Sequence, residues 1–120
     1  MKSNSSAVLI KSKEFALCII DLYRFLSQEK KEFIISKQIL RSGTSVGANA
    51  KEASLAQSKA DFIAKLSISL KESGETEYWL ELLFESNFID KNQFNILYTK
   101  NKELIKIITS ILKTTKANNC

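Results

Sequence analysis

Apolar residues recur along this chain at spacings of three and four, which is the period of an amphipathic α-helix. The first such stretch covers about residues 7–28 and carries Phe15, Cys18, Leu22 and Phe25 on one stripe. The second covers about residues 34–57, where the expected inward positions are spaced alternately by four and three residues. Its expected inward seam consists of Ile35, Ile39, Ser42, Val46, Asn49, Ala53 and Ala56.

Two capping signals divide the second half of the chain. Ser58 and Asp61 have the spacing of a capping box, which predicts a third helix over about 59–87. Asp90 and Gln93 repeat that pattern before a fourth helix over about 91–116, and Asn87 suits a left-handed helix stop. The expected inward residues are Phe62, Leu66, Ser69, Ser73, Thr76, Leu80 and Leu83 on the third helix, and Leu97, Asn101, Leu104, Ile108 and Ile111 on the fourth.

Four long helices joined by short polar connections predict an all-α fold, an antiparallel up-down-up-down four-helix bundle. The chain has 120 residues, no Pro and only three Gly, a composition that does not fit a turn-rich all-β fold. We expect one domain over residues 1–120, with an ordered core over about 7–116.

The residue types limit the available chemistry. The chain has no His, so the usual general base and the commonest zinc ligand are absent. Cys18 lies in an apolar run and Cys120 is the last residue, and two cysteines predict neither a disulfide framework nor a metal cluster. No apolar segment approaches the roughly 20 residues that cross a bilayer. We therefore expect a cytoplasmic, non-enzymatic protein with no catalytic residue, metal, cofactor, membrane contact or small-molecule substrate.

Residues 41–53, RSGTSVGANAKEA, are unusually rich in small side chains. A phosphate-binding loop would need a preceding strand and a Gly-Lys-Ser/Thr ending, and neither is present. In a helix, Gly43, Gly47 and Ala50 form a thin strip, although each Gly costs about 1 kcal/mol relative to Ala. We expect close helix packing against this strip, with Tyr78, Trp79 and Phe84 of the third helix as the candidate fillers.

A polar layer is also predicted between the second and third helices. Ser42 and Asn49 are expected to face Ser69, Ser73 and Thr76, a layer that must be hydrogen-bonded throughout to be stable. Arg41, Glu52 and Glu72 fall close enough in register to join it through an ion pair. A paired Glu52 and Glu72 could instead act in acid/base catalysis, but without His or a metal motif the pattern favours a structural network.

Charge is unevenly distributed along the chain. Residues 72–90 hold six carboxylates and no Lys or Arg, whereas residues 91–120 hold six Lys and one Glu. Four lysines share one face of the predicted fourth helix, namely Lys102, Lys106, Lys113 and Lys116. That face could meet nucleic-acid phosphates. A plain solvated helix face explains it as well.

The stretch Arg41–Ala53, followed by Leu66-Ser67-Ile68-Ser69-Leu70-Lys71-Glu72 and Glu77-Tyr78-Trp79-Leu80, resembles the 23S rRNA intervening-sequence protein family. That family includes the accessory variability proteins of diversity-generating retroelements. The resemblance covers about residues 10–115 and implies a four-helix bundle that assembles as a ring-like homopentamer. The family's signature positions correspond here to Arg41, Ser45, Asn49, Glu52, Ser69 and Glu72, and they are not established catalytic residues.

The resemblance leaves two function hypotheses. The first is a pentameric accessory protein that binds RNA or DNA. The second is a protein-interaction scaffold that recruits a reverse transcriptase or another partner. Retroelement accessory proteins are strongly basic, whereas this chain has a net charge of only +5. The apolar residues of the fourth helix cover an arc of roughly 160°, whereas a helix that faces one core needs only ~100°. The wider arc fits either a contact with another subunit or a more deeply buried helix.

Overall fold

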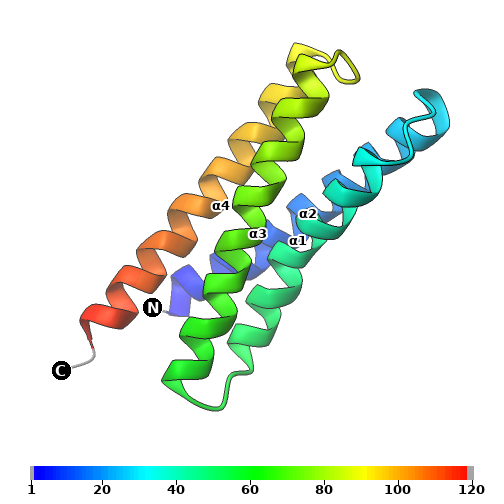
Figure 1. The fold of residues 1–120 in the computed structure, drawn as a ribbon. Helices are drawn as coiled ribbons and strands as arrows, with labels where there is room; N and C mark the ends of the chain where they lie inside the picture. Colours follow the sequence, from blue (N-terminus) through cyan, green and yellow to red (C-terminus); the bar gives the residue numbers. More distant parts are fainter. Residues whose placement is uncertain (1, 119–120) are drawn as a thin grey trace.

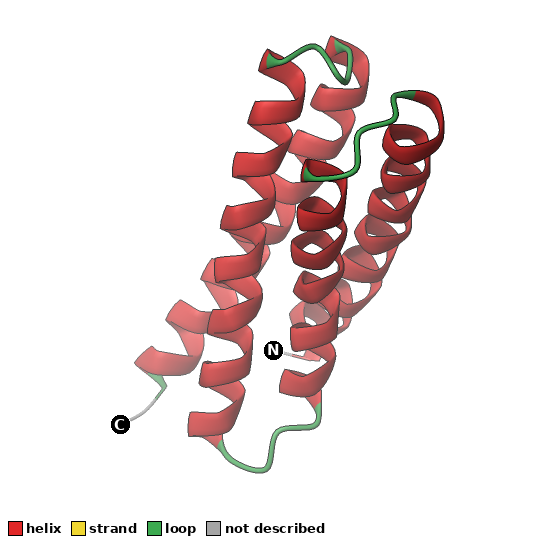
Figure 2. Ribbon diagram, turned by 45° about the vertical axis from the view of Figure 1, so that its right-hand side comes forward, coloured by secondary structure: helices red, strands yellow, loops and turns green. Residues whose placement is uncertain are grey.

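The computed structural model describes residues 2–118, with side chains from Ser6 onward, and the described chain is all helical with no strand. Its elements are α1 (Lys2–Arg24), the π-helical turn η1 (Phe25–Glu29), α2 (Ile35–Ser54), α3 (Lys59–Glu85) and α4 (Lys91–Ala117). The predicted all-α fold with bundle packing is confirmed (Figures 1 and 2). Cys120 lies outside the described residues.

Consecutive helices run in opposite directions along a rod that measures 51 × 22 × 19 Å (Figure 1). The α2–α3 pair makes the most extensive contact, followed by α1–α2 and α3–α4, and a smaller contact between α1 and α4 closes the bundle. The α1–α2 connection and the α3–α4 connection lie at one end of the rod. The α2–α3 connection lies at the other (Figure 2).

The predicted helix signals in the second half of the chain are present. Ser58 accepts a 3.0 Å hydrogen bond from the Asp61 backbone N–H at the start of α3. Asp90 and Gln93 form a complete capping box, with hydrogen bonds of 2.8 and 2.9 Å. Asn87 has a φ of 69°, so the left-handed stop after α3 is confirmed.

The start of α1 was predicted too late. The helix begins at Lys2, because residues 3–6 are polar but contain no Gly or Pro to interrupt it. Apolar periodicity cannot detect such a segment. At the other boundaries, α2 ends at Ser54, three residues early, and α3 ends at Glu85, while α4 runs one residue beyond the expected end.

Glu32 caps α2, a role that periodicity did not reveal. Its carboxylate accepts hydrogen bonds from the backbone N–H groups of Ile34, Ile35 and Ser36 at 3.2, 3.0 and 2.7 Å. The Ser36 hydroxyl donates back to the Glu32 carbonyl at 2.8 Å. Negative charge at a helix N-terminus is stabilising, so this side chain fixes the direction in which α2 leaves the turn.

The core contains the stripes that the periodicity predicted. On α3, all of the expected inward residues are buried except Phe62, which is half-buried, and on α4 all five are buried. On α2 the pattern is less complete, since Ile35, Asn49 and Ala56 are only half-buried. The buried polar residues are Ser12, Ser36, Ser42, Ser69, Ser73, Thr76, Asn101 and Thr115.

Candidate functional site

The thin strip of α2 packs against α1. A Cβ atom added at Gly43 would lie 2.7 Å from Cγ1 and 2.9 Å from Cγ2 of Ile19, and one at Gly47 would lie 3.3 Å from the backbone oxygen of Ser12. Ala50 is also buried. Tyr78, Trp79 and Phe84 were therefore the wrong fillers. A periodic strip shows which face of a helix is thin, but it does not show which neighbour covers that face.

The polar layer between α2 and α3 forms around Ser42, Ser69 and Thr76, all fully buried. The hydroxyls of Thr76 and Ser42 share a 2.9 Å hydrogen bond, and Thr76 also bonds to the Glu72 carbonyl at 2.8 Å. Ser69 donates to the Val46 carbonyl at 2.6 Å. The Ser42–Thr76 and Ser69–Val46 bonds pin the register of α2 against α3, because each of them joins the two helices.

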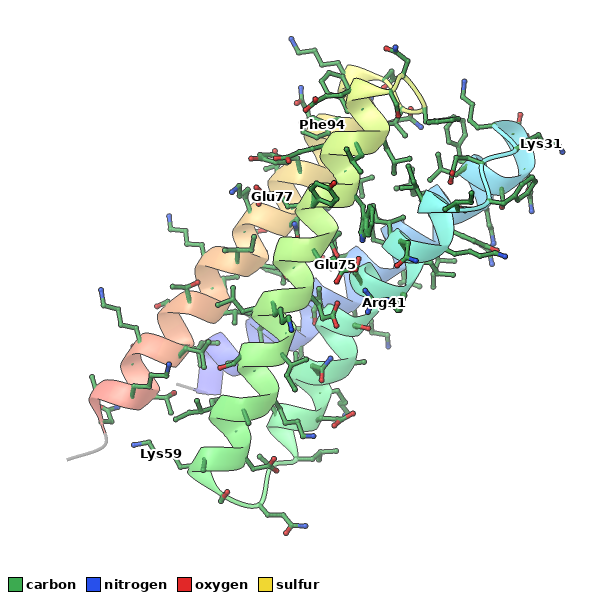
Figure 3. All side chains as sticks on the ribbon, viewed as in Figure 1. Lys31, Arg41, Lys59, Glu75, Glu77 and Phe94 are labelled. Atoms are coloured by element: carbon green, nitrogen blue, oxygen red, sulfur yellow. The ribbon has the colours of Figure 1, made fainter. Side chains whose placement is uncertain are left out.

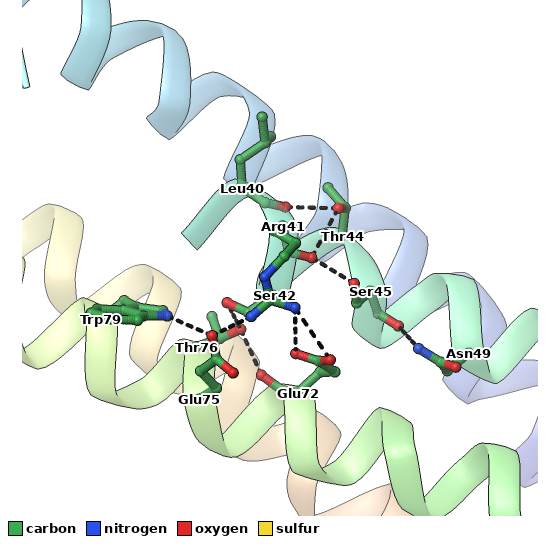
Figure 4. Close-up of polar contacts among 10 residues, drawn as sticks. All are labelled: Leu40, Arg41, Ser42, Thr44, Ser45, Asn49, Glu72, Glu75, Thr76 and Trp79. Carbon is green, nitrogen blue, oxygen red and sulfur yellow. Dashed lines mark hydrogen bonds and ion pairs between the residues drawn. The ribbon is translucent and has the colours of Figure 1, made fainter. Parts of the chain in front are cut away.

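An ion-pair network covers the solvent side of this layer (Figure 4). Arg41 Nη1 lies 3.2 Å from Glu72 Oε1, while Arg41 Nη2 pairs with Glu75. The indole Nε1–H of Trp79 donates to Glu75 at 3.0 Å. Glu75 is the partner that the sequence did not single out. Its position, three residues after Glu72 and four before Trp79, places all three groups on one face of α3.

The electrostatics of this cluster favour its charged forms. The hydrogen bond to Glu75 is the largest influence that raises the pKa of Arg41. For Glu75, the hydrogen bond from Trp79 and then the Arg41 contact hold the pKa below the ordinary range of glutamate. The carboxylate therefore acts as a fixed hydrogen-bond acceptor, not as a group poised to take up a proton near neutral pH.

The remaining signature residues on α2 have local or separate partners. Ser45 donates to the Arg41 carbonyl at 2.6 Å, and Asn49 donates to the Ser45 carbonyl at 2.9 Å, both within the helix. Glu52 pairs with Lys65 at 3.3 Å. Asn49 is half-buried, and the hydrogen bond of its amide is to its own helix and not to the α3 layer. Glu52 and Glu72 each pair with a cation of their own, so the predicted joint network is split in two.

A second buried contact joins α3 to α4. The amide of Asn101 donates to the Ser73 carbonyl at 2.9 Å, and both side chains are fully buried. The Ser73 hydroxyl and the Asn101 side-chain oxygen have no hydrogen-bond partner in the described structure. A buried polar atom without a partner is destabilising by about 1–3 kcal/mol, so these two atoms offset part of the stability that the contact contributes.

The predicted lysine face of α4 divides into two parts. Lys102 pairs with Glu77 at 2.9 Å and lies 5.4 Å from the centroid of the Tyr98 ring. The hydrogen bond that Lys102 donates to Glu77 is the main influence that raises the Lys102 pKa. Lys106, Lys113 and Lys116 are exposed and make no ion pair with another described residue. Of the four lysines on this face, these three are therefore the ones without a carboxylate partner among the described residues.

Two shallow grooves open beside the free lysines, between α3 and α4. One has a volume of about 340 Å³ and is lined by Leu70, Thr109, Leu112, Lys113 and Lys116. The other, about 470 Å³, also borders Lys116 and continues over the start of α3 to Ser58, Lys59, Ala60 and Ile63. The grooves give the basic surface an apolar floor. They lie at the end of the rod marked by Lys59 in Figure 3.

A third groove, between α1 and α2, has a volume of about 370 Å³ and is mostly apolar. Gly47 and Ala48 form its floor on one side, and Lys13 and Lys51 border it. Among the described residues, no group of three His, Cys, Asp or Glu side chains is arranged to hold a metal ion.

A comparison with known protein families shows which family this chain resembles. Residues 4–110 match the model of the 23S rRNA-intervening sequence protein family. The chain belongs to this family. The RSGTSVGANAKEA stretch is thus the part of the family member that holds α2 against α1 on one side and against α3 on the other.

The fold agrees with a solved structure at high sequence identity. A crystal structure at 1.70 Å resolution of a protein with unknown function from the S23 ribosomal protein family of Bacteroides thetaiotaomicron shares 54% identity and a TM-score of 0.91. The match covers 92% of this chain and 98% of that one. No curated protein matches the sequence. Within residues 2–118, no helix combines the length and apolarity needed to cross a membrane.

Proposed function

We propose that this family member is a cytoplasmic, non-enzymatic homopentamer that binds RNA or DNA through the lysine face of α4. The observation that carries the proposal is the exposure of Lys106, Lys113 and Lys116 without an acidic partner among the described residues. The family name, which refers to an intervening sequence of 23S rRNA, supports a nucleic-acid ligand.

The electrostatics support contacts to phosphate more than base recognition. Each lysine that neutralises a phosphate releases counterions and adds to the affinity without regard to sequence. Lys102 contributes little under this proposal, because its ammonium is already paired with Glu77. Five copies in a ring would repeat the three free lysines and raise the avidity.

Fluorescence anisotropy with labelled RNA at ~50 mM salt tests the proposal. We expect the wild-type protein to bind and the triple variant Lys106→Gln, Lys113→Gln, Lys116→Gln to bind at least tenfold more weakly. The matched control neutralises three exposed lysines outside α4, Lys13, Lys51 and Lys71, with the same change in net charge. Equal losses in the two triple variants would contradict the assignment to α4, and no binding by the wild type would reject the proposed function.

The proposed self-association is supported by exposed apolar residues on α1, and not by those on α4. Ile105 and Ile107, the residues that widen the α4 arc, are half-buried within a single chain. Ile10 and Leu17 on α1 are 60% and 56% exposed, and large apolar side chains exposed on one helix often mark an interface. The mass in solution tests this part: we expect five times 13.6 kDa for the wild type and a smaller species for Leu17→Asp. A monomeric wild type would contradict it.

A protein-interaction scaffold is the second candidate. The acidic half of α3 favours it, since Glu81 and Glu85 make no ion pair with another described residue, and so does the apolar α1–α2 groove. A reverse transcriptase or another basic partner would fit this charge. Recovery of ribosomal or retroelement RNA without any specific protein, in a pull-down from native cells, would count against this alternative.

A further inference from the structure

The connection between α1 and α2 presents an unusual combination of side chains at its tip, residues 30–37. Ile34 is 76% exposed and Phe33 is 53% exposed, and Phe33 is the only phenylalanine among the described ones that is exposed. The bundle gains nothing from leaving these two side chains in water. The tip lies at the end of the rod marked by Lys31, opposite Lys59 (Figure 3).

Hydrogen bonds of Glu32 hold the backbone of the tip. Glu32 fixes the backbone on both sides of Phe33 through its hydrogen bonds to Ile34, Ile35 and Ser36. The Glu32 N–H donates to the Leu26 carbonyl at 2.9 Å, which ties the same residue back to η1. A side chain on such a clamped turn loses little backbone freedom when it binds a ligand.

The segment around Phe33 carries a net charge of +1 over residues 29–37, because three lysines outnumber Glu29 and Glu32. Lys30, Lys31 and Lys37 are exposed and make no ion pair with another described residue, although Lys30 lies 5.7 Å from the Phe25 ring centroid. The negative charge of Glu32 is directed at the N-terminus of α2, where it offsets the helix dipole instead of the lysines. Lys31 adopts a left-handed backbone with a φ of 55°, an unfavourable conformation for a residue with a long side chain.

We propose that the α1–α2 tip binds an unpaired nucleotide, with the Phe33 ring stacked on the base and Lys30, Lys31 and Lys37 contacting the flanking phosphates. An exposed ring surrounded by cations is the arrangement that single-stranded nucleic acid requires, since stacking accepts any base and the lysines follow the backbone. The part of α4 that carries the three unpaired lysines, residues 106–116, has no aromatic residue for this purpose. The tip therefore adds a preference for unpaired strands, and this inference rests on the proposed function.

The test compares a single strand of about 16 nucleotides with a duplex of the same length, by fluorescence anisotropy on the full chain. Phe33→Leu retains an apolar side chain but removes the π face, and Phe33→Tyr retains the ring. We expect Phe33→Leu to weaken single-strand binding by about 5- to 100-fold and duplex binding by less than twofold. Phe33→Tyr should bind like the wild type. Ile34→Ala is the matched control for apolar surface lost at the same tip.

The outcomes separate this inference from the proposed function. If the wild type binds RNA but Phe33→Leu binds the single strand equally well, the tip assignment is overturned and the α4 assignment stands. If the wild type binds neither strand nor duplex, both are overturned. Unchanged single-strand binding, together with binding to phosphatidylserine vesicles that both Phe33→Leu and Ile34→Ala reduce, would assign the tip to a lipid surface instead.

Discussion

The contact between Gly43 and Ile19 gives a quantitative test of how α1 packs on α2. Replacing Gly43 with Ala places a methyl group 2.7 and 2.9 Å from two carbons of Ile19, a side chain that is itself fully buried. Ile19 is branched at Cβ and has little freedom to turn away. Gly74 offers a matched control, because a Cβ there would meet nothing within 4 Å.

The two substitutions have one contribution to the free energy of unfolding in common and differ in a second. Each removes a glycine from a helix interior, which favours folding by about 1 kcal/mol. Overpacking opposes this gain only at Gly43, by about 1–3 kcal/mol. We therefore expect Gly74→Ala to stabilise the protein by about 1 kcal/mol and Gly43→Ala to be between neutral and about 2 kcal/mol destabilising. The difference between the variants reports the contact itself.

Urea unfolding at one fixed protein concentration measures this difference, because self-association makes apparent stability concentration-dependent. Ile19→Ala, which removes both clashing carbons, should cost less in the Gly43→Ala background than in the wild type, by at least ~1 kcal/mol. If Gly43→Ala stabilises as much as Gly74→Ala, the close approach of α1 and α2 at this point is refuted.

Three further changes test other parts of the structure. Thr76→Val should destabilise by about 1–3 kcal/mol, because it leaves the buried Ser42 hydroxyl without its partner, and adding Ser42→Ala should recover part of that loss in the same urea assay. Because the pKa of Glu75 is lowered in the folded protein, this residue stabilises the fold above the ordinary pKa of glutamate, and the stabilisation is lost as pH falls through the folded pKa. Glu75→Gln should therefore flatten this part of the curve when the unfolding free energy is measured against pH. An unchanged curve would contradict the pairing. Lys102→Gln should reduce RNA affinity less than Lys106→Gln, because only Lys102 is paired, and the reverse order in anisotropy would show that the Glu77 pair opens on binding.

The sequence was most informative where one helix repeated a clear pattern. The α3 stripe from Leu66 to Leu83 and the left-handed Asn87 both follow from local rules, periodicity and capping, that need no knowledge of the neighbours. The polar pair of Ser42 and Thr76 was also within reach, because two seams that face each other bring their polar members together.

The sequence could not determine which helix fills a given face. The strip at Gly43 and Gly47 fits a large side chain from α3 as well as it fits Ile19 and Ser12 of α1, and only the three-dimensional packing decides. Glu32 was missed because its role depends on the backbone direction of a turn. Glu75 was missed because Glu72 alone already supplies an acidic partner for Arg41. The structure shows that Arg41 pairs with both carboxylates.

The proposed contact between three lysines of α4 and phosphate is tested most directly by the salt dependence of RNA affinity. We would measure it for the wild type and for the Lys106→Gln, Lys113→Gln, Lys116→Gln variant. Each phosphate contact adds about 0.7–0.9 to the slope of log affinity against log salt, so the variant should have a slope shallower by about 2–3. Equal slopes for the two proteins would contradict the assignment.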